Sequence, residues 1–275
     1  MPDQPSYVRV FLTFMRNSLI RDMSFRSNFI IECISSVSWV LMSLGFYVLI
    51  FRYSPMIGEG TGWGKYEFFA FLATTLFVNS VVQAFFMPNA DEFSELIRTG
   101  ALDFALLKPI DTQFLISLRK VSWASLANFL FAVGLLGYSL YQMGYVPPWF
   151  QIALYPVYLL FGVLILYSLM IAMAAMSVWM GRNQNLYNFW FYITNFSRYP
   201  MEIYEGRFGT PLRRAFTFVV PILIVVNVPA RFLVRPLSAQ GWWLVVFALF
   251  ATVASLLVSR LIFTRALLSY RSASS

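Results

Sequence analysis

Hydrophobic residues gather in six long runs along the chain. The runs cover residues 29–51, 68–88, 121–141, 152–180, 215–233 and 242–263. Each run is close to or above the roughly 20 residues that an α-helix needs to cross a bilayer. Lipid offers backbone amides no hydrogen-bond partner, so such runs become helices. The pattern therefore predicts an all-α integral membrane protein with six transmembrane helices.

The N-terminal segment mixes apolar and basic residues instead. Val10, Phe11 and Phe14 recur at helical spacing beside Arg9 and Arg16. An apolar stripe opposite basic side chains favours the boundary between lipid headgroups and acyl chains. We therefore predict an N-terminal amphipathic interfacial helix over residues 6–27, with a disordered basic tail as the alternative.

These elements form a single domain over residues 1–275. The interfacial helix occupies residues 1–28, the six-span bundle residues 29–263 and a cytoplasmic tail residues 264–275. Residues 186–200 are apolar and aromatic but too short for a span. They form either an interfacial helix or an extension of a neighbouring span.

Composition supports the membrane interpretation. Hydrophobic residues make up 59% of the chain and charged residues 12%, against about 25% charged in an average soluble domain. Lys and Arg number 20 and Asp and Glu 12, but the basic residues lie between apolar runs and form no continuous patch. We therefore expect membrane lipid, and no nucleic acid, as a partner.

The distribution of Lys and Arg predicts the orientation of the chain. The connections on one side, residues 1–28, 89–120, 181–214 and 260–275, hold 16 Lys and Arg, and those on the other side hold 4. Cytoplasmic loops carry an excess of these residues. The N- and C-termini of this multi-pass protein are therefore expected in the cytoplasm.

Catalytic chemistry is poorly represented in the sequence. There is no histidine and one cysteine, Cys33, so the commonest general base and metal ligand is missing. Around residues 60–65, Glu59 and Tyr66 stand where a phosphate-binding loop needs Gly and Ser or Thr. We predict no enzyme activity, no metal and no cofactor in this chain.

The span centres carry no charged residue that could bind a coupling ion or relay protons. Uphill transport would then need energy from another subunit. Residues 89–100 are a candidate helix on which that subunit could dock. Asn89 and Glu92 have the spacing of a capping box, and Gly100 suits the left-handed position after a helix. We predict a short cytoplasmic coupling helix, with a helix resting on lipid headgroups as the alternative.

An apolar stripe on this helix, Phe93, Leu96 and Ile97, lies opposite Asp91 and Glu95. The residues predicted to dock an ATPase are Asp91, Glu92, Phe93, Glu95, Leu96, Ile97, Arg98 and Gly100. Those predicted to support the docking loop are Leu102, Asp103, Lys108 and Pro109.

Several motifs carry a resemblance to a known family. They are Ile97 to Asp103 followed by Leu106 to Pro109, Ser197-Arg198-Tyr199-Pro200, Pro221, Pro229-Ala230 and the C-terminal Tyr270 to Ser275. In this order they resemble bacterial ABC-2-type transporter permeases, and more narrowly a branch of similar chain length formerly of unknown function. The resemblance covers nearly the whole chain.

The resemblance implies the partners. It implies a second permease subunit, identical or related, and two copies of an ABC ATPase that bind ATP and Mg and dock between spans 2 and 3. It also implies a bacterial cell inner membrane location and export. Some ABC-2 exporters have re-entrant helices between spans 5 and 6, but the predicted segment here, residues 234–241, is short.

The substrate and the competing functions stay open at this point. Aromatic residues make up 19% of the chain, which suits an amphipathic or cationic drug or xenobiotic, although rings that face lipid or neighbouring helices are the better explanation for most of them. Export of lipid or of a lipid-linked glycan is also open. The alternative class is a non-transporting membrane scaffold or assembly protein, and no charged or carbonyl-rich filter segment favours a channel.

Overall fold

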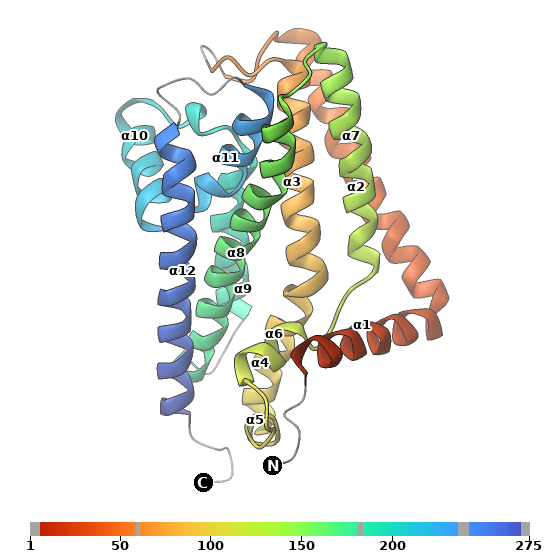
Figure 1. The fold of residues 1–275 in the computed structure, drawn as a ribbon, viewed down its shortest axis with the longest axis vertical. Coiled ribbons are helices and arrows are strands. Elements are labelled where there is room, and N and C mark those ends of the chain that lie inside the picture. Colours follow the sequence, from red (N-terminus) through yellow and green to blue (C-terminus); the bar gives the residue numbers. More distant parts are fainter. Residues whose placement is uncertain (1–5, 59–60, 181–183, 236–241, 271–275) are drawn as a thin grey trace.

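The computed structural model describes residues 6–58, 61–180, 184–235 and 242–270, and Figure 1 shows their arrangement. Five helical stretches are long and apolar enough to cross a membrane. They are Arg26–Tyr53, Lys65–Thr99, Ala124–Met143, Trp149–Trp179 and Trp242–Ser269. The prediction of an all-α integral membrane protein is therefore confirmed.

The five stretches correspond to predicted spans 1, 2, 3, 4 and 6. They contain α2 (Arg26–Tyr53), α3 (Lys65–Phe85) with α4 (Met87–Thr99), α7 (Ala127–Met143), α8 (Trp149–Met180) and α12 (Trp242–Ser269). The short helices α5 (Leu102–Leu106) and α6 (Thr112–Leu118) lie between α4 and α7. We call helices α4–α6 the projection, the end of the bundle that holds them the projection end, and the end with residues 54–58 and 61–64 the loop end (Figure 1).

The N-terminal segment is a helix, α1 (Tyr7–Ser24), and not a disordered tail. It lies across the bundle at the projection end, steeply inclined to α2 (Figure 1). The hydroxyl of Ser18 accepts a hydrogen bond from the Val121 amide at 3.0 Å, and the Trp123 indole donates to the Met15 carbonyl at 3.3 Å. The helix is thus fastened to the connection that leads into α7.

The predicted continuous span over residues 215–233 is wrong. A helix over Gly206–Val219, made of α10 (Gly206–Arg214) and a π-helical turn, meets α11 (Ile222–Val234) at an angle of 88°. The break falls at Pro221, which lacks an amide hydrogen and cannot continue the helical hydrogen bonding.

Both flanks of this bent pair lie at the loop end. Glu202, before α10, accepts a hydrogen bond from the Trp63 indole at 3.0 Å. Arg235, after α11, donates to the Gly62 carbonyl at 2.7 Å and stands over the Trp63 ring at 4.5 Å. Because the chain leaves and returns to the same loop, the segment is re-entrant and does not cross the membrane. Residues 236–241 of the expected short connection over residues 234–241 lie outside the described residues.

The return from the projection end is made instead by residues 184–200, whose placement the sequence left open. These residues form α9 (Gln184–Asn195) and the 3-10 turn Phe196–Arg198. Fifteen helical residues extend roughly 22 Å, which is most of the hydrocarbon thickness. This segment is too short to count among the helices long enough to cross a membrane, which number five within the described residues.

This topology weakens the charge bias that predicted the orientation. Arg207, Arg213 and Arg214 on α10 belong to the loop end, whereas the count from sequence placed them with the N-terminal and 89–120 segments. Arg182 lies outside the described residues. The projection end keeps the larger share of basic residues, and the cytoplasmic termini stay a prediction.

The core of the bundle centres on α11. Nearly every one of its residues is buried, and it packs mainly against α8 and α3. At the crossing of α8 and α11, a Cβ added at Gly162 would lie 2.5 Å from the Val225 carbonyl oxygen. Small residues permit such close approach of helices in membranes.

Candidate functional site

The projection is built around a break between α3 and α4. Pro88 stands in the first turn of α4, where a missing amide hydrogen costs nothing. The helix ends at Gly100, which has a φ of 72°, a conformation that favours glycine. The predicted C-terminal end of this helix is therefore confirmed, and its N-cap, Phe86, lies three residues before the predicted N-cap.

Asn89 is not the N-cap of this helix, as the sequence had indicated. It is fully buried inside the first turn, where its amide donates to the Phe85 and Lys120 carbonyls at 2.7 Å each. Its side-chain oxygen accepts from the Lys120 amide at 2.8 Å. The residue therefore joins the α3–α4 break to the connection before α7.

The apolar stripe of α4 faces the protein's own bundle. Phe93 is 1% exposed, and its ring lies 5.9 Å from that of Phe263 on α12. Leu96 and Ile97 are partly buried and pack against the same hydrophobic core. A partner could not reach Phe93 without displacing α12. The amphipathic pattern of α4 is thus explained by packing within the chain.

The acidic residues of α4 divide between three environments. Glu92 pairs with Arg119 at 3.5 Å and Lys120 at 3.2 Å. Glu95 and Arg98 form an exposed ion pair with each other, and Asp91 lines a cavity that is described below. Glu92 is thus held against the bundle, whereas Asp91, Glu95 and Arg98 are exposed.

The outermost apolar surface of the projection belongs to α5. Phe104 is 73% exposed, Leu107 80% and Leu106 39%, while Leu102 and Ala105 on the other face are buried. Sequence reasoning placed Phe104, Leu106 and Leu107 beside the docking loop but not among its docking residues. The signal was present, since Leu102, Phe104, Leu106 and Leu107 cannot all face the bundle from so short a helix, and an apolar side chain left over is exposed unless a partner covers it.

Helix α6 connects the projection to two spans. The Asp111 carboxylate caps α6 by accepting from the Phe114 amide at 2.9 Å, and it pairs with Arg260 of α12 at 2.7 Å. Gln113 donates to the hydroxyl of Tyr167 on α8 at 2.9 Å. These contacts would therefore transmit a movement of the projection to α8 and α12.

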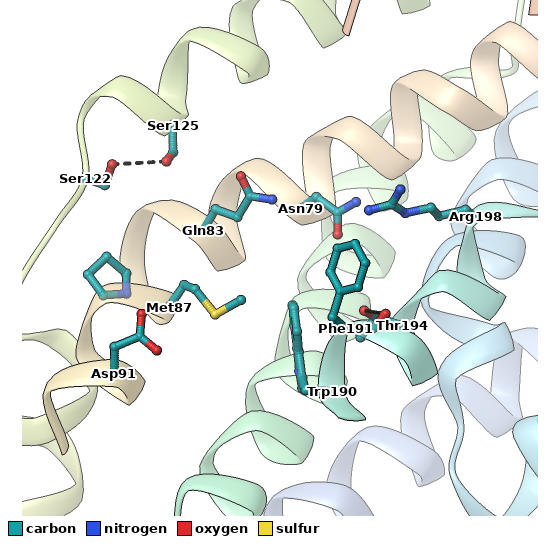
Figure 2. A pocket seen from close by; sticks show the side chains of 11 residues that line it. Asn79, Gln83, Met87, Asp91, Ser122, Ser125, Trp190, Phe191, Thr194 and Arg198 are labelled. Atoms are coloured by element: carbon teal, nitrogen blue, oxygen red, sulfur yellow. Dashed lines mark hydrogen bonds between the residues drawn. The ribbon is translucent and has the colours of Figure 1, made fainter. Parts of the chain in front are cut away.

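A polar cavity of about 480 Å³ lies beside the α3–α4 break (Figure 2). Helices α3, α4 and α9 and the connection before α7 contribute its walls. The residues that line it are Asn79, Gln83, Met87, Pro88, Asp91, Ser122, Ser125, Trp190, Phe191, Thr194 and Arg198. We refer to it as the polar cavity.

A second cavity, of about 590 Å³, shares Pro88 and Ser122 with the first. It is lined further by Phe25 and Phe29 at the corner between α1 and α2, and by polar residues there. The two cavities therefore form neighbouring spaces that extend from the bundle toward the level of the amphipathic α1.

Comparison with known proteins identifies the family to which the chain belongs. Residues 37–274 match the model of a family described as ABC-2 family transporter protein. The chain belongs to the ABC-2 transporter family. No curated protein and no solved structure matches it. Members of this family are the membrane-spanning components of ABC transporters and work with an ABC ATPase, which confirms the resemblance drawn from the sequence motifs.

In this ABC-2 permease the supporting residues of the docking loop also take distinct positions. Leu102 is fully buried, and Lys108 and Pro109 are exposed at the tip. The Asp103 carboxylate interacts with Tyr270 beyond α12, where burial and this carboxylate raise the pKa of the tyrosine hydroxyl. The docking role of all these residues stays a prediction.

Proposed function

We propose that this ABC-2 permease forms half of the translocation path of an ATP-driven exporter in the bacterial inner membrane, with both termini in the cytoplasm. A second permease, identical or related, supplies the other half. Two separate ABC ATPase subunits bind ATP and Mg and dock on the projection end. The family match over residues 37–274 is the observation that carries this proposal.

The exposed apolar tip of α5 supports the docking part of the proposal. Phe104 and Leu107 are two large exposed side chains, and Glu95 and Arg98 form an exposed ion pair on α4 of the same projection. A buried aromatic or aliphatic anchor with a charged rim is the usual composition of a binding hot spot. We therefore move the proposed contact from the Phe93 stripe on α4 to α5 and the outward face of α4.

The permease pairing is supported by α2. This helix is apolar along its length, yet among its described residues only Val40 is buried within the chain. Trp39, Met42 and Phe46 are among its exposed side chains. Lipid or a neighbouring permease covers such a surface, and pairing through α2 would bury part of it.

An affinity experiment tests the proposal. The chain is tagged in its native host, solubilised gently and purified with its bound partners, either as wild type or as Phe104→Asp/Leu107→Asp. We expect a cassette ATPase with the wild type and its loss from the double variant, because a carboxylate at the interface core cannot be desolvated without a partner. Size-exclusion profiles of the two chains check that both are folded.

The matched control is Phe208→Asp. Phe208 is 85% exposed on α10 at the loop end, so the same aromatic-to-carboxylate change lies at the opposite end of the bundle. We expect this variant to retain the ATPase. Recovery of the ATPase by the double variant would refute the α5 contact, and absence of any ATPase from intact wild-type complexes would favour a membrane scaffold.

The proposed substrate is an amphipathic molecule. The polar cavity combines carboxamides, hydroxyls and opposite charges with Met87, Trp190 and Phe191, so a solute with one polar and one apolar part suits it. An amphipathic drug or xenobiotic falls within this class. Most aromatic rings elsewhere pack against one another inside the bundle, such as Phe68 on Phe71 and Phe196 on Phe216, and carry no information on the substrate.

A further inference from the structure

Arg198 has no counter-ion in the part of the chain that the structure describes. It is half-buried and belongs to none of the ion pairs between the described residues. Figure 2 shows its guanidinium facing Asn79 on α3. Asp91, the other charged residue that lines the polar cavity, follows Asn79 by twelve helical residues, or about 18 Å, and is exposed on the projection. The cavity therefore leaves the charge of Arg198 uncompensated.

The position of Asn79 places this charge inside the membrane. At one end of α3, the ring of Phe85 lies 6.2 Å from that of Phe11 on the amphipathic helix α1, so α1 lies at the level of Phe85. Asn79 precedes Phe85 by six residues, or about 9 Å of helix, and follows Lys65 at the loop end by about 21 Å. Charged side chains at such depth are costly, and for that reason they line the pathways of ions and substrates.

The cavity has a polar end and an apolar end. Its lining residues recur at intervals of four on both walls, as Asn79, Gln83 and Met87 on one and Arg198, Thr194 and Trp190 on the other. Helix α9 runs opposite to α3, so Asn79 lies with Arg198 and Met87 lies toward Trp190 (Figure 2). Eight helical residues, or about 12 Å, separate the two ends. The volume of about 480 Å³ is that of a site for a drug-sized molecule.

The polar end has the chemistry of an anion site. The Arg198 guanidinium lies 5.5 Å from the centre of the Phe191 ring. A guanidinium stacked on a ring keeps its N–H groups free, and these match the oxygens of a carboxylate, sulfonate or phosphate. The Asn79 carboxamide, which has no hydrogen-bond partner among the described residues, adds N–H donors at this end. A cationic group here would be repelled by Arg198.

We propose that the polar cavity binds a compact amphipathic anion, with its charged group at Arg198 and Asn79 and its apolar body toward Met87 and Trp190. The inference rests on the proposed function and deepens it by naming the substrate class. A lipid of the surrounding bilayer has the opposite orientation, because its charge lies at the level of α1 and its chains lie deeper. The site therefore suits a small organic solute.

Equilibrium binding tests the proposal on the full chain in nanodiscs of phosphatidylcholine, which contribute no anionic lipid. Three probes share a naphthalene body: naphthalene sulfonate is the anion, naphthylmethylammonium the cation and naphthalenemethanol the neutral compound. Inorganic sulfate has the anionic group without the body, and lysophosphatidylglycerol represents a lipid source of the charge. We expect naphthalene sulfonate to bind at least about tenfold more tightly than each of the other four probes.

Variants of the polar end test the role of its charge. Arg198→Gln should weaken binding of naphthalene sulfonate by about tenfold and leave that of naphthalenemethanol unchanged, because only the sulfonate interacts with the guanidinium. Asn79→Asp places a carboxylate opposite Arg198 and should also weaken binding of the sulfonate, since the guanidinium then has a counter-ion within the chain. Arg198→Lys keeps the charge and should retain part of the affinity, which guards against a misfolded Arg198→Gln chain.

The matched control is Arg207→Gln. The Arg207 guanidinium lies 5.9 Å from the centre of the Phe208 ring, but it is exposed on α10 and lines neither of the two cavities described above. This variant should bind like the wild type.

Three results would each overturn the anion site: equal affinity of the wild type and Arg198→Gln for naphthalene sulfonate, tighter binding of the naphthylmethylammonium cation, or equally tight binding of inorganic sulfate. Tighter binding of lysophosphatidylglycerol than of the sulfonate, lost in Arg198→Gln, would overturn the assignment to a compact solute in favour of a lipid headgroup.

The outcomes also separate the cavity from the proposed function. Arg198→Gln should still recover the cassette ATPase, because Arg198 lies outside the projection. If the predicted binding pattern holds while no ATPase is ever recovered, the site stands and the exporter proposal fails. If the ATPase is recovered but Arg198→Gln binds the sulfonate normally, the exporter proposal stands and this inference fails.

Discussion

The close crossing of α8 and α11 makes a quantitative prediction for Gly162→Ala. The new Cβ would lie 2.5 Å from the Val225 carbonyl oxygen, whereas carbon–oxygen contacts are ordinarily about 3.3–3.6 Å. The methyl group therefore requires the two helices to separate by roughly 1 Å at this point. Overpacking of this kind costs about 1–3 kcal/mol.

The Val225 carbonyl is unusual because Pro229 stands four residues later inside α11. Proline has no amide hydrogen to donate to that carbonyl, and its ring pushes the carbonyl away from the helix axis. Gly162 provides the space for it. A Pro229→Ala change should return the carbonyl to the helical ladder, so Gly162→Ala should cost less in that background than in the wild type.

The control is Gly137→Ala on α7, where no atom lies within 4 Å of an added Cβ. Both substitutions gain the same helix propensity, about 1 kcal/mol, so their difference isolates the overpacking. Thermal unfolding in detergent, followed by tryptophan fluorescence, measures it. Equal unfolding temperatures for Gly162→Ala and Gly137→Ala would refute the close approach, and strict additivity with Pro229→Ala would refute the role of the proline.

Two further predictions concern the projection. Asn89→Ala removes the partners of three backbone groups and should lower stability by about 1–3 kcal/mol for each group left unsatisfied; an unchanged unfolding temperature would contradict this bracing role. For Asp111, burial raises the pKa, but hydrogen bonds from Arg260 and from backbone amides lower it more, so the pKa lies below its ordinary value. The resulting stabilisation is complete above the unfolded-state pKa of about 3.9 and is lost as pH falls through the lower folded-state value. Unfolding temperature should therefore decline in strong acid, and Asp111→Asn should reduce this decline.

Most of the architecture could be predicted from hydropathy because each long apolar run has only one way to satisfy its backbone in lipid. The re-entrant segment could not. Residues 215–233 are as apolar as a span, and hydropathy cannot tell a helix that crosses from one that turns back. Contacts of Glu202 and Arg235 with the distant Trp63 decide the topology, and such contacts leave no local pattern in the sequence.

The candidate site was predictable in location but not in orientation. The apolar stripe of α4 and its end at Gly100 are local features, and both are present. The pattern shows that the stripe needs a partner, yet it does not show that the partner is Phe263 of the same chain. The cavity drew no prediction, because Arg198 lies more than a hundred residues from Asn79 and Asp91 in sequence and only the return of the chain through residues 184–200 brings it to the same cavity.

The two proposed sites share one helix. Helix α4 carries the exposed Glu95 and Arg98 ion pair, and Asp91 on the same helix lines the cavity. Asn89 fixes the beginning of this helix to Lys120, two residues before the cavity-lining Ser122. A displacement of α4 at the docking surface would therefore move the cavity wall that Asp91 forms, so that docking at the projection and the shape of the polar cavity are coupled through one helix.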